Sequence, residues 1–136
     1  MMEDELTIGR ISALSGISVD TIRFYERKGL IKPPQRNASG YRVYPHEVVD
    51  QMRFIKRSRD LRFSLQEVSE LFNFIFEGDG QSKEVQKRIE KKILEINEHL
   101  EELTTIREQL EQLLKICKND STFESATLLD HFLKYS

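Results

Sequence analysis

The chain has 136 residues, enough for one domain or for one small domain with an extension. Three prolines and six glycines exclude a linker-like protein, and no apolar run reaches the roughly 20 residues of a membrane-spanning helix. The acidic N-terminal segment lacks the apolar core of a signal peptide, and the lone Cys117 cannot form an internal disulfide. We therefore expect a cytoplasmic protein with no membrane partner.

Charge is divided unevenly along the chain. Residues 1–62 carry 12 Lys and Arg against 8 Asp and Glu, a net charge of +4, whereas residues 63–136 carry 9 against 15, a net charge of −6. Without the acidic start, residues 6–62 stand at +7. A basic module joined to an acidic region is typical of a domain that binds a polyanion such as DNA, although chance segregation of surface charge gives the same pattern.

The first predicted elements are two short helices joined by a tight turn. An apolar-periodic helix is expected over residues 8–14 and a second over residues 19–28, with Ser18 as the N-cap of the second. A glycine ends each helix. Ile22 is the expected core residue of the second helix, with Phe24 beside it. Two short helices around a glycine-containing turn predict a helix-turn-helix.

A β wing and two further helices follow in the predicted order. Two strands, at 30–31 and 41–44, flank a loop that contains proline and glycine. A third helix is expected over residues 45–58, opened by its proline. A fourth is expected over residues 65–76, with a capping box of Ser64 and Glu67 and an apolar stripe that includes Ile75, and a break follows it at Gly78-Asp79-Gly80. The predicted fold is therefore all-α with a small β wing, a winged helix-turn-helix followed by a long helix.

The long helix, over residues 81–118, carries a heptad repeat. Asn119-Asp120-Ser121 is expected to end it, and a short helix is expected over residues 127–133. Eight of the nine a and d positions of the long helix are apolar if Cys117 is counted, and residues 82–117 correspond to about 54 Å of helix at ~1.5 Å per residue. The rest of the chain is too small to cover such a seam, so we expect a second copy to bury it in a coiled-coil homodimer. The predicted seam consists of Ile89, Ile93, Ile96, Leu100, Leu103, Leu110 and Leu114.

The charged residue in this seam, Arg107, bears on the direction of pairing. In a parallel, in-register pair it would face its own counterpart, with repulsion between like charges. An antiparallel pair avoids this contact and sends the two basic units to opposite ends, which suits the two half-sites of a palindrome.

The segments IRFYERKGL at 22–30 and GYRVY at 40–44 resemble the MerR family of bacterial transcription regulators. The resemblance spans residues 7–117, and the long helix with a cysteine at its end is most similar to the metal-sensing branch, nearest to its copper-efflux regulators. The regions that this resemblance implies are a winged helix-turn-helix DNA-binding domain at 6–76, a dimerisation helix at 81–118, and an effector loop with a short helix at 119–136.

The family resemblance implies a dimer on promoter DNA whose two elements are set too far apart. Effector binding then distorts the DNA so that RNA polymerase can engage both elements. In physical terms, the effector shifts a dimer between two conformations, and the deformation of the DNA is the result. An enzyme is not expected, since the sequence has no phosphate-binding glycine loop, HExxH motif or known nucleophile pair. A coiled-coil adaptor with a protein-docking head is the alternative, and salt-dependent DNA binding would separate the two.

The residues that this resemblance implies for DNA contact are arginines and tyrosines. Arginine forks onto phosphate or guanine, and a tyrosine hydroxyl donates to phosphate. Core packing is the alternative for the tyrosines, and simple solvation for the arginines. The expected residues are Arg23 and Tyr25 on the second helix, Tyr41, Arg42 and Arg36 in the first wing, and Arg59 and Arg62 in the second wing.

Cys117 is the candidate effector residue. Copper-sensing members of the family hold a monovalent ion between two cysteines, and the second position is Ser125 here, so a two-cysteine Cu(I) site is not expected. Three interpretations stay open: a divalent metal site, a thiol that senses an electrophile or oxidant, and a small apolar seam residue. The metal site would use Cys117 and His131, completed by Asp120, Glu124 or Asp130.

Overall fold

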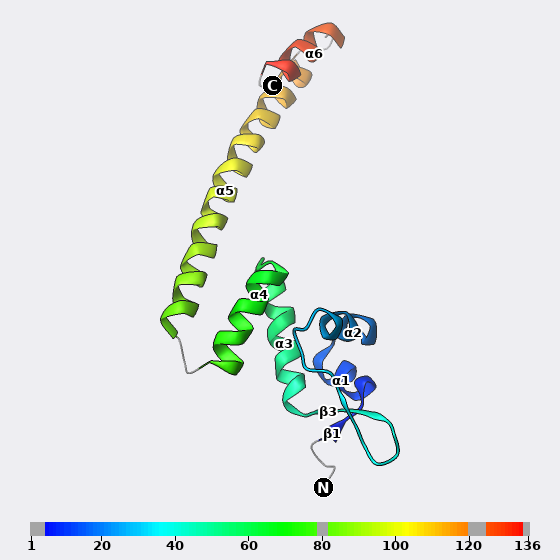
Figure 1. Ribbon diagram of the computed structural model, residues 1–136. Coiled ribbons are helices and arrows are strands. Elements are labelled where there is room, and N and C mark those ends of the chain that lie inside the picture. The colour runs from blue at the N-terminus through cyan, green and yellow to red at the C-terminus, as the bar shows by residue number, and fades with distance from the viewer. Residues whose placement is uncertain (1–4, 79–81, 120–124, 135–136) are drawn as a thin grey trace. The chain divides into compact units, whose positions relative to one another are not determined.

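The structure is a computed structural model of the chain that describes residues 5–78, 82–119 and 125–134 (Figure 1). The chain forms two compact units, Met1–Ile89 and Glu90–Ser136, here called the head and the C-terminal unit. The head contains the short helices and the strands, and a single long helix runs from the end of the head into the C-terminal unit. Among the described helices, none is long and apolar enough to cross a membrane.

The helix-turn-helix prediction is confirmed. Helix α1 spans Ile8–Ser15 and ends at Gly16, whose φ of 75° is the left-handed conformation that glycine adopts freely. Helix α2 spans Val19–Arg27, one residue shorter than predicted. The side chain of its N-cap, Ser18, accepts a hydrogen bond from the backbone N–H of Thr21, the third residue of the helix.

The prediction that Phe24 lies in the core beside Ile22 is wrong. Ile22 is fully buried, but Phe24 is 38% exposed. Two residues along a helix correspond to about 200°, so the two side chains point to opposite faces. Tyr25, three residues after Ile22, packs against the core in its place.

Three short antiparallel strands form the wing sheet, in the order β1–β3–β2. Strand β1 is Glu5–Leu6, β2 is Gln35–Arg36 and β3 is Arg42–Pro45. Gln35 pairs with Val43 and Arg36 with Arg42, while Glu5 and Leu6 pair with Pro45 and Tyr44 on the other edge of β3.

The predicted strand at 30–31 is wrong. Leu30 and Ile31 are buried in the hydrophobic core and pair with no strand in the described part of the chain. Gly29 reverses the chain with a φ of 77°, which directs these two apolar residues into the core. The ladder position beside β3 is occupied by Gln35–Arg36 instead.

Helices α3 and α4 complete the head. Helix α3 spans Glu47–Asp60, two residues later than predicted at both ends, because Pro45 is still paired with β1 as the last residue of β3. Helix α4 spans Leu65–Phe72, and the predicted capping box between Ser64 and Glu67 is confirmed.

The last part of the predicted fourth helix is a π-helical segment, η2, over Asn73–Glu77. Its wider turn rotates the following side chains away from the stripe that a regular α-helix would give. Ile75, expected in the apolar stripe, is accordingly 47% exposed.

The core of the head draws on helices α1, α2, α3 and α4 and on strand β3. Its cluster also takes in Phe63 and Phe72, and Val85 from the start of the long helix packs against it. The largest fully buried side chains are Ile11, Ile22, Tyr44, Met52, Ile55 and Val68.

The long helix α5 spans Ser82–Asn119, one residue beyond the predicted end at residue 118. Helix α6 spans Ser125–Leu133, and the short terminal helix predicted at 127–133 is confirmed with an earlier start. The break predicted at Gly78-Asp79-Gly80 lies largely outside the described residues, as do two of the three residues predicted to end the long helix, Asp120 and Ser121.

Candidate nucleic-acid interface

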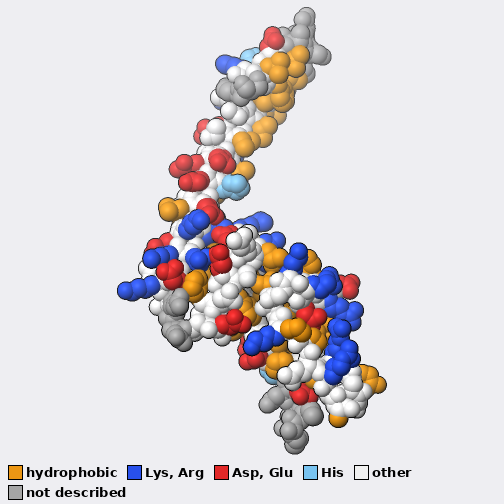
Figure 2. Space-filling model, viewed as in Figure 1, with side chains coloured by type: hydrophobic (Ala, Val, Ile, Leu, Met, Phe, Trp, Pro, Cys, Tyr) orange, Lys and Arg blue, Asp and Glu red, His pale blue; other side chains and the backbone are white. Residues whose placement is uncertain are grey.

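Helix α2 presents cationic side chains to solvent while its other face holds it to the head. Ile22 is buried, and Arg23, Arg27 and Lys28 are exposed. Figure 2 shows Lys and Arg side chains gathered over this helix. A short helix with exposed arginines and a buried anchor is suited to the major groove of DNA.

Helix α3 adds cationic groups beside the helix-turn-helix turn. Arg53 Nη2 donates to the carbonyl oxygen of Leu14 at 2.8 Å, which ties α3 to the last turn of α1. A Cβ at Gly16 would stand 3.5 Å from Lys56 Nζ. Arg53 and Lys56 were not predicted as site residues, since only the tertiary structure brings α3 to this turn.

Glu26 connects α2 to the wing. The hydroxyl of Tyr44 donates to Glu26 Oε1 at 2.9 Å, and Arg42 Nη1 lies 3.9 Å from Glu26 Oε2. The Glu26 side chain is only 14% exposed. Because the carboxylate of Glu26 contacts both Tyr44 and Arg42 of β3, it fixes the position of β3 relative to α2. Sequence analysis missed Glu26, whose signal was an acid inside an otherwise basic segment.

Tyr44 remains a hydrogen-bond donor over a wide pH range. Burial in the core, followed by the hydrogen bond to Glu26 and its negative charge, raises the pKa of Tyr44 to about 12. The Tyr44 hydroxyl is therefore protonated at neutral pH and can donate the hydrogen bond that joins β3 to α2.

The tip of the first wing is a tight turn built around Asn37. Its Oδ1 accepts hydrogen bonds from the backbone N–H groups of Ser39 and Tyr41, both at 3.0 Å. Arg36 Nη1 donates to the carbonyl oxygen of Gly40 at 2.7 Å, so one part of its guanidinium already braces the wing. Tyr41 is 70% exposed, which contradicts the core-packing alternative for this residue.

The second wing is the connection between α3 and α4. Arg59 Nη1 donates to the carbonyl oxygen of Phe63 at 3.0 Å and so closes the turn. Arg62 is exposed and has a φ of 75°, unusual for a residue other than glycine. Left-handed backbone at a non-glycine residue is often retained where the side chain has a function.

The predicted contact residues fall into two groups. Arg23, Arg36, Tyr41, Arg42, Arg59 and Arg62 are exposed, whereas Tyr25 is partly buried. Tyr25 packs against the core, with its ring 5.6 Å from that of Phe24, and the guanidinium groups of Arg36 and Arg59 each make one backbone contact.

The candidate effector residues lie in the C-terminal unit. Cys117, in α5, and His131, in α6, are both partly buried. Among the described residues, no three His, Cys, Asp or Glu side chains lie close enough to hold a metal ion. Asp120 and Glu124 lie outside the described residues, and Asp130 is exposed on α6. The described residues therefore do not by themselves complete the predicted metal site.

Comparison with known proteins agrees with this architecture. Residues 6–75 match the family described as "MerR HTH family regulatory protein", and residues 49–113 match the one described as "MerR, DNA binding". The HTH-type transcriptional regulator CueR of Escherichia coli O6:H1 is 34% identical over 117 residues, which cover 86% of this chain and 87% of that protein.

Two solved structures of transcription regulators share the fold. A regulator from Ralstonia metallidurans in complex with lead(II) has a TM-score of 0.76 at 27% identity, over 89% of this chain and 92% of that one. A regulator from Bacillus megaterium in complex with mercury(II) has a TM-score of 0.73 at 27% identity, over 95% and 100% of the two chains. These relatives are transcription regulators and not enzymes, as predicted.

Proposed function

Because this chain belongs to the MerR family and is thus a DNA-binding transcription regulator, we propose that it acts as a homodimer on a palindromic promoter site. DNA binding is assigned to residues 6–76, dimerisation to residues 81–118 and effector response to residues 119–136. The basic face of the head supports the first assignment, since cationic and tyrosine side chains of α2 and both wings are exposed there.

The uncovered apolar seam of α5 is the observation that carries the proposal of a homodimer. The seam residues are 39–57% exposed, and further apolar side chains, Leu94 and Ile106, are exposed on the same helix. A contiguous apolar surface of this length marks an interaction site. A second copy offers the same heptad pattern and buries both seams together.

Arg107 favours an antiparallel arrangement of the two copies. Its Nε lies 3.7 Å from Glu111 Oε1 on the same helix, and both side chains are largely exposed. An exposed pair of this kind contributes only about 0.3–0.5 kcal/mol, so it reduces the repulsion of a parallel pair without removing it.

Contacts between the start of α5 and α4 support a route from the dimer to the DNA. Arg88 donates to Glu70 of α4 and lies 5.0 Å from the centre of the Phe74 ring. Val85 packs against the core of the head. A shift of α5 would therefore move the second wing, which precedes α4, and distort the bound DNA so that RNA polymerase engages the promoter.

We further propose that the effector acts at Cys117, with a soft divalent metal ion as the first candidate. Relatives with this fold bind lead(II) and mercury(II), and thiolate ligands suit such ions. His131 is the second ligand candidate, and a complete site would need ligands beyond the described residues or from the second chain. A thiol sensor is the second candidate, because the described residues place no three-ligand group around Cys117.

Sedimentation and footprinting test the proposed dimer on DNA. We expect a dimer at micromolar concentration and protection of two symmetric half-sites on promoter DNA. A folded monomer at that concentration, or protection of a single half-site, would contradict the proposal.

Promoter transcription with and without Cys117→Ser tests the effector assignment. The parent is assayed with Zn(II), Cd(II), Cu(I), an aldehyde and an oxidant, and we expect one of them to change transcription in the parent only. Loss of a metal response in His131→Gln as well would support the metal site, whereas a response that survives in Cys117→Ser would contradict both candidates.

A further inference from the structure

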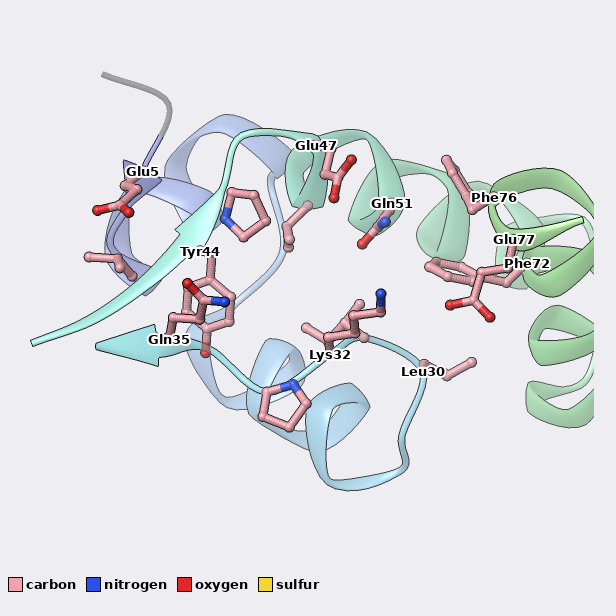
Figure 3. A pocket seen from close by; sticks show the side chains of 15 residues that line it. Glu5, Leu30, Lys32, Gln35, Tyr44, Glu47, Gln51, Phe72, Phe76 and Glu77 are labelled. Atoms are coloured by element: carbon pink, nitrogen blue, oxygen red, sulfur yellow. The ribbon is translucent and has the colours of Figure 1, made fainter. Parts of the chain in front are cut away.

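The head contains a cavity of about 470 Å³ that none of the predicted DNA-contact residues lines (Figure 3). Its walls come from the segment at 30–33, strands β1, β2 and β3, the start of α3, the end of α4 and the end of η2. All of these belong to the head, so the cavity exists without a second chain or the effector segment. Its volume is in the range of about 300–1,000 Å³ typical of small-molecule sites.

One side of the cavity is an aromatic and aliphatic surface. Phe72 and Phe76 line it, and their ring centroids lie 4.7 Å apart. Phe76 remains 39% exposed because it belongs to the π-helical segment, whose wider turn displaces it from the core. Leu30 and Val48 extend this apolar surface. It therefore offers ring faces and methyl groups to a flat apolar ligand.

The charged residues of the lining are mostly acidic, in contrast with the basic head around them. Glu5, Glu47 and Glu77 line the cavity against a single cation, Lys32. In Figure 3, Glu47 and Gln51 lie across the cavity from Lys32, while Glu77 lies beside Phe72 and Glu5 lies at the other end of the lining. Phosphates would be repelled by three carboxylates, so DNA is not the occupant.

One carboxylate of the lining, that of Glu5, has an oxygen without a partner. Glu5 Oε2 is shielded from solvent and has no hydrogen-bond partner in the described part of the chain. A shielded carboxylate oxygen without a partner costs free energy that a bound cation would recover. Aromatic ring faces attract cations as well, so the apolar surface and the charge favour the same kind of ligand.

We propose that this cavity binds a small organic cation with a flat apolar body, such as an aromatic amine. The apolar body packs on Phe72 and Phe76, and the ammonium group lies among the carboxylates at the opening. The proposal concerns the head alone and does not depend on the dimer or on Cys117.

Calorimetric titration of the full chain without DNA tests this site. The probe is 1-naphthylmethylamine, and its neutral counterpart 1-naphthylmethanol has the same ring system. We expect one amine per chain, with the alcohol bound at least about tenfold more weakly because it lacks the charge. Equal affinity for the two probes, or no amine binding at millimolar concentration, would overturn the proposal.

Charge-neutralising variants test which residues hold the ammonium group. Glu77→Gln and Glu47→Gln should each weaken amine binding about tenfold, and Phe76→Ala should weaken both probes. Lys32→Gln removes the competing cation and should tighten amine binding severalfold. Asp50→Asn, on α3 but outside the lining, is the matched control and should leave the affinity unchanged.

Two outcomes would contradict the assignment of these residues. One is parental amine affinity in both glutamate variants when circular dichroism shows that they are folded. The other is weaker amine binding in Lys32→Gln, because the loss of a competing cation should strengthen the binding of a cationic ligand. Footprinting of the glutamate variants separates this result from the proposed regulator function, since their DNA protection should match that of the parent.

Discussion

The head and the C-terminal unit use the same aliphatic residue types in opposite ways. In the head, Ile11, Ile22 and Ile55 are fully buried within one chain. In the C-terminal unit, Leu100 and Leu103 of the predicted seam remain more than half exposed. The head therefore completes its own core, whereas α5 presents an apolar surface that a second chain is proposed to bury.

The largest expected effect is on the seam. Leu103→Asp would place a charge in the proposed apolar interface of both copies, and we expect dimer affinity to fall by about a thousandfold or more. Sedimentation equilibrium measures the change. Thr105→Asp, an exposed position on the outer face of the same helix, should leave the dimer intact, and dissociation of both variants to the same extent would indicate a general loss of helix stability.

A core substitution in the head should behave differently. Met52 is fully buried, and Met52→Ala should lower the free energy of unfolding by about 2–5 kcal/mol. Since the head core is formed within one chain, this loss should not depend on protein concentration, unlike that of a seam variant. Denaturation at two concentrations distinguishes the two cases, and a concentration-dependent loss in Met52→Ala would break the comparison.

The pKa of Tyr44 predicts an alkaline stability loss that belongs to the head. The unfolded chain releases this proton near the ordinary pKa of 10.0, while in the folded chain the pKa is about 12. Stability from this group is fully present below pH 10 and declines as pH rises through about 12, by about 2–3 kcal/mol in total. Denaturant melts measure the free energy of unfolding of the parent and of Tyr44→Phe between pH 9 and about 12. The difference between the two should shrink as pH rises, and a constant difference would exclude the raised pKa of Tyr44 as its cause.

Removal of a cation from α2 tests the DNA-binding face. Arg23→Ala should weaken promoter binding by about 1–3 kcal/mol and leave the dimer intact. Electrophoretic mobility shifts over a series of salt concentrations measure both the affinity and its salt dependence. Lys83→Ala, an exposed cation near the start of α5, is the control, and equal affinity in Arg23→Ala and the parent would remove this residue from the interface.

The smallest expected effect concerns the left-handed backbone of Arg62. Arg62→Gly relieves the φ of 75° and should raise the free energy of unfolding by up to about 1 kcal/mol. The same change removes a cation from the second wing and should weaken DNA binding. Thermal melts and mobility shifts should therefore move in opposite directions, and an unchanged DNA affinity would leave Arg62 with a structural role only.

Short-range signals predicted most of the helices correctly. The cap at Ser18, the capping box at Ser64 and the left-handed stop at Gly16 each involve residues within four positions of one another. Such interactions depend on residues close together in the sequence, so the local residue order is enough to locate them. The prediction of a strand at 30–31 was wrong because an apolar dipeptide after a glycine turn fits a strand and a buried loop in the core equally well.

The prediction of the DNA-contact residues rests on their chemistry and on the family resemblance. The tertiary structure refines this set, because it shows which of the predicted side chains are exposed and which make contacts within the head. Arg42 and Glu26 are 16 positions apart in sequence, and nothing local links them.

By itself, the sequence determined the helical elements with their caps, the division of charge and the heptad seam, because these depend on residue type and on spacing within a few turns. The tertiary structure alone decided the pairing of β1 with β3, the Glu26–Tyr44 contact and the acidic cavity beside the wing. Each of these joins residues that lie far apart in the chain, so their proximity follows only from packing of the whole head.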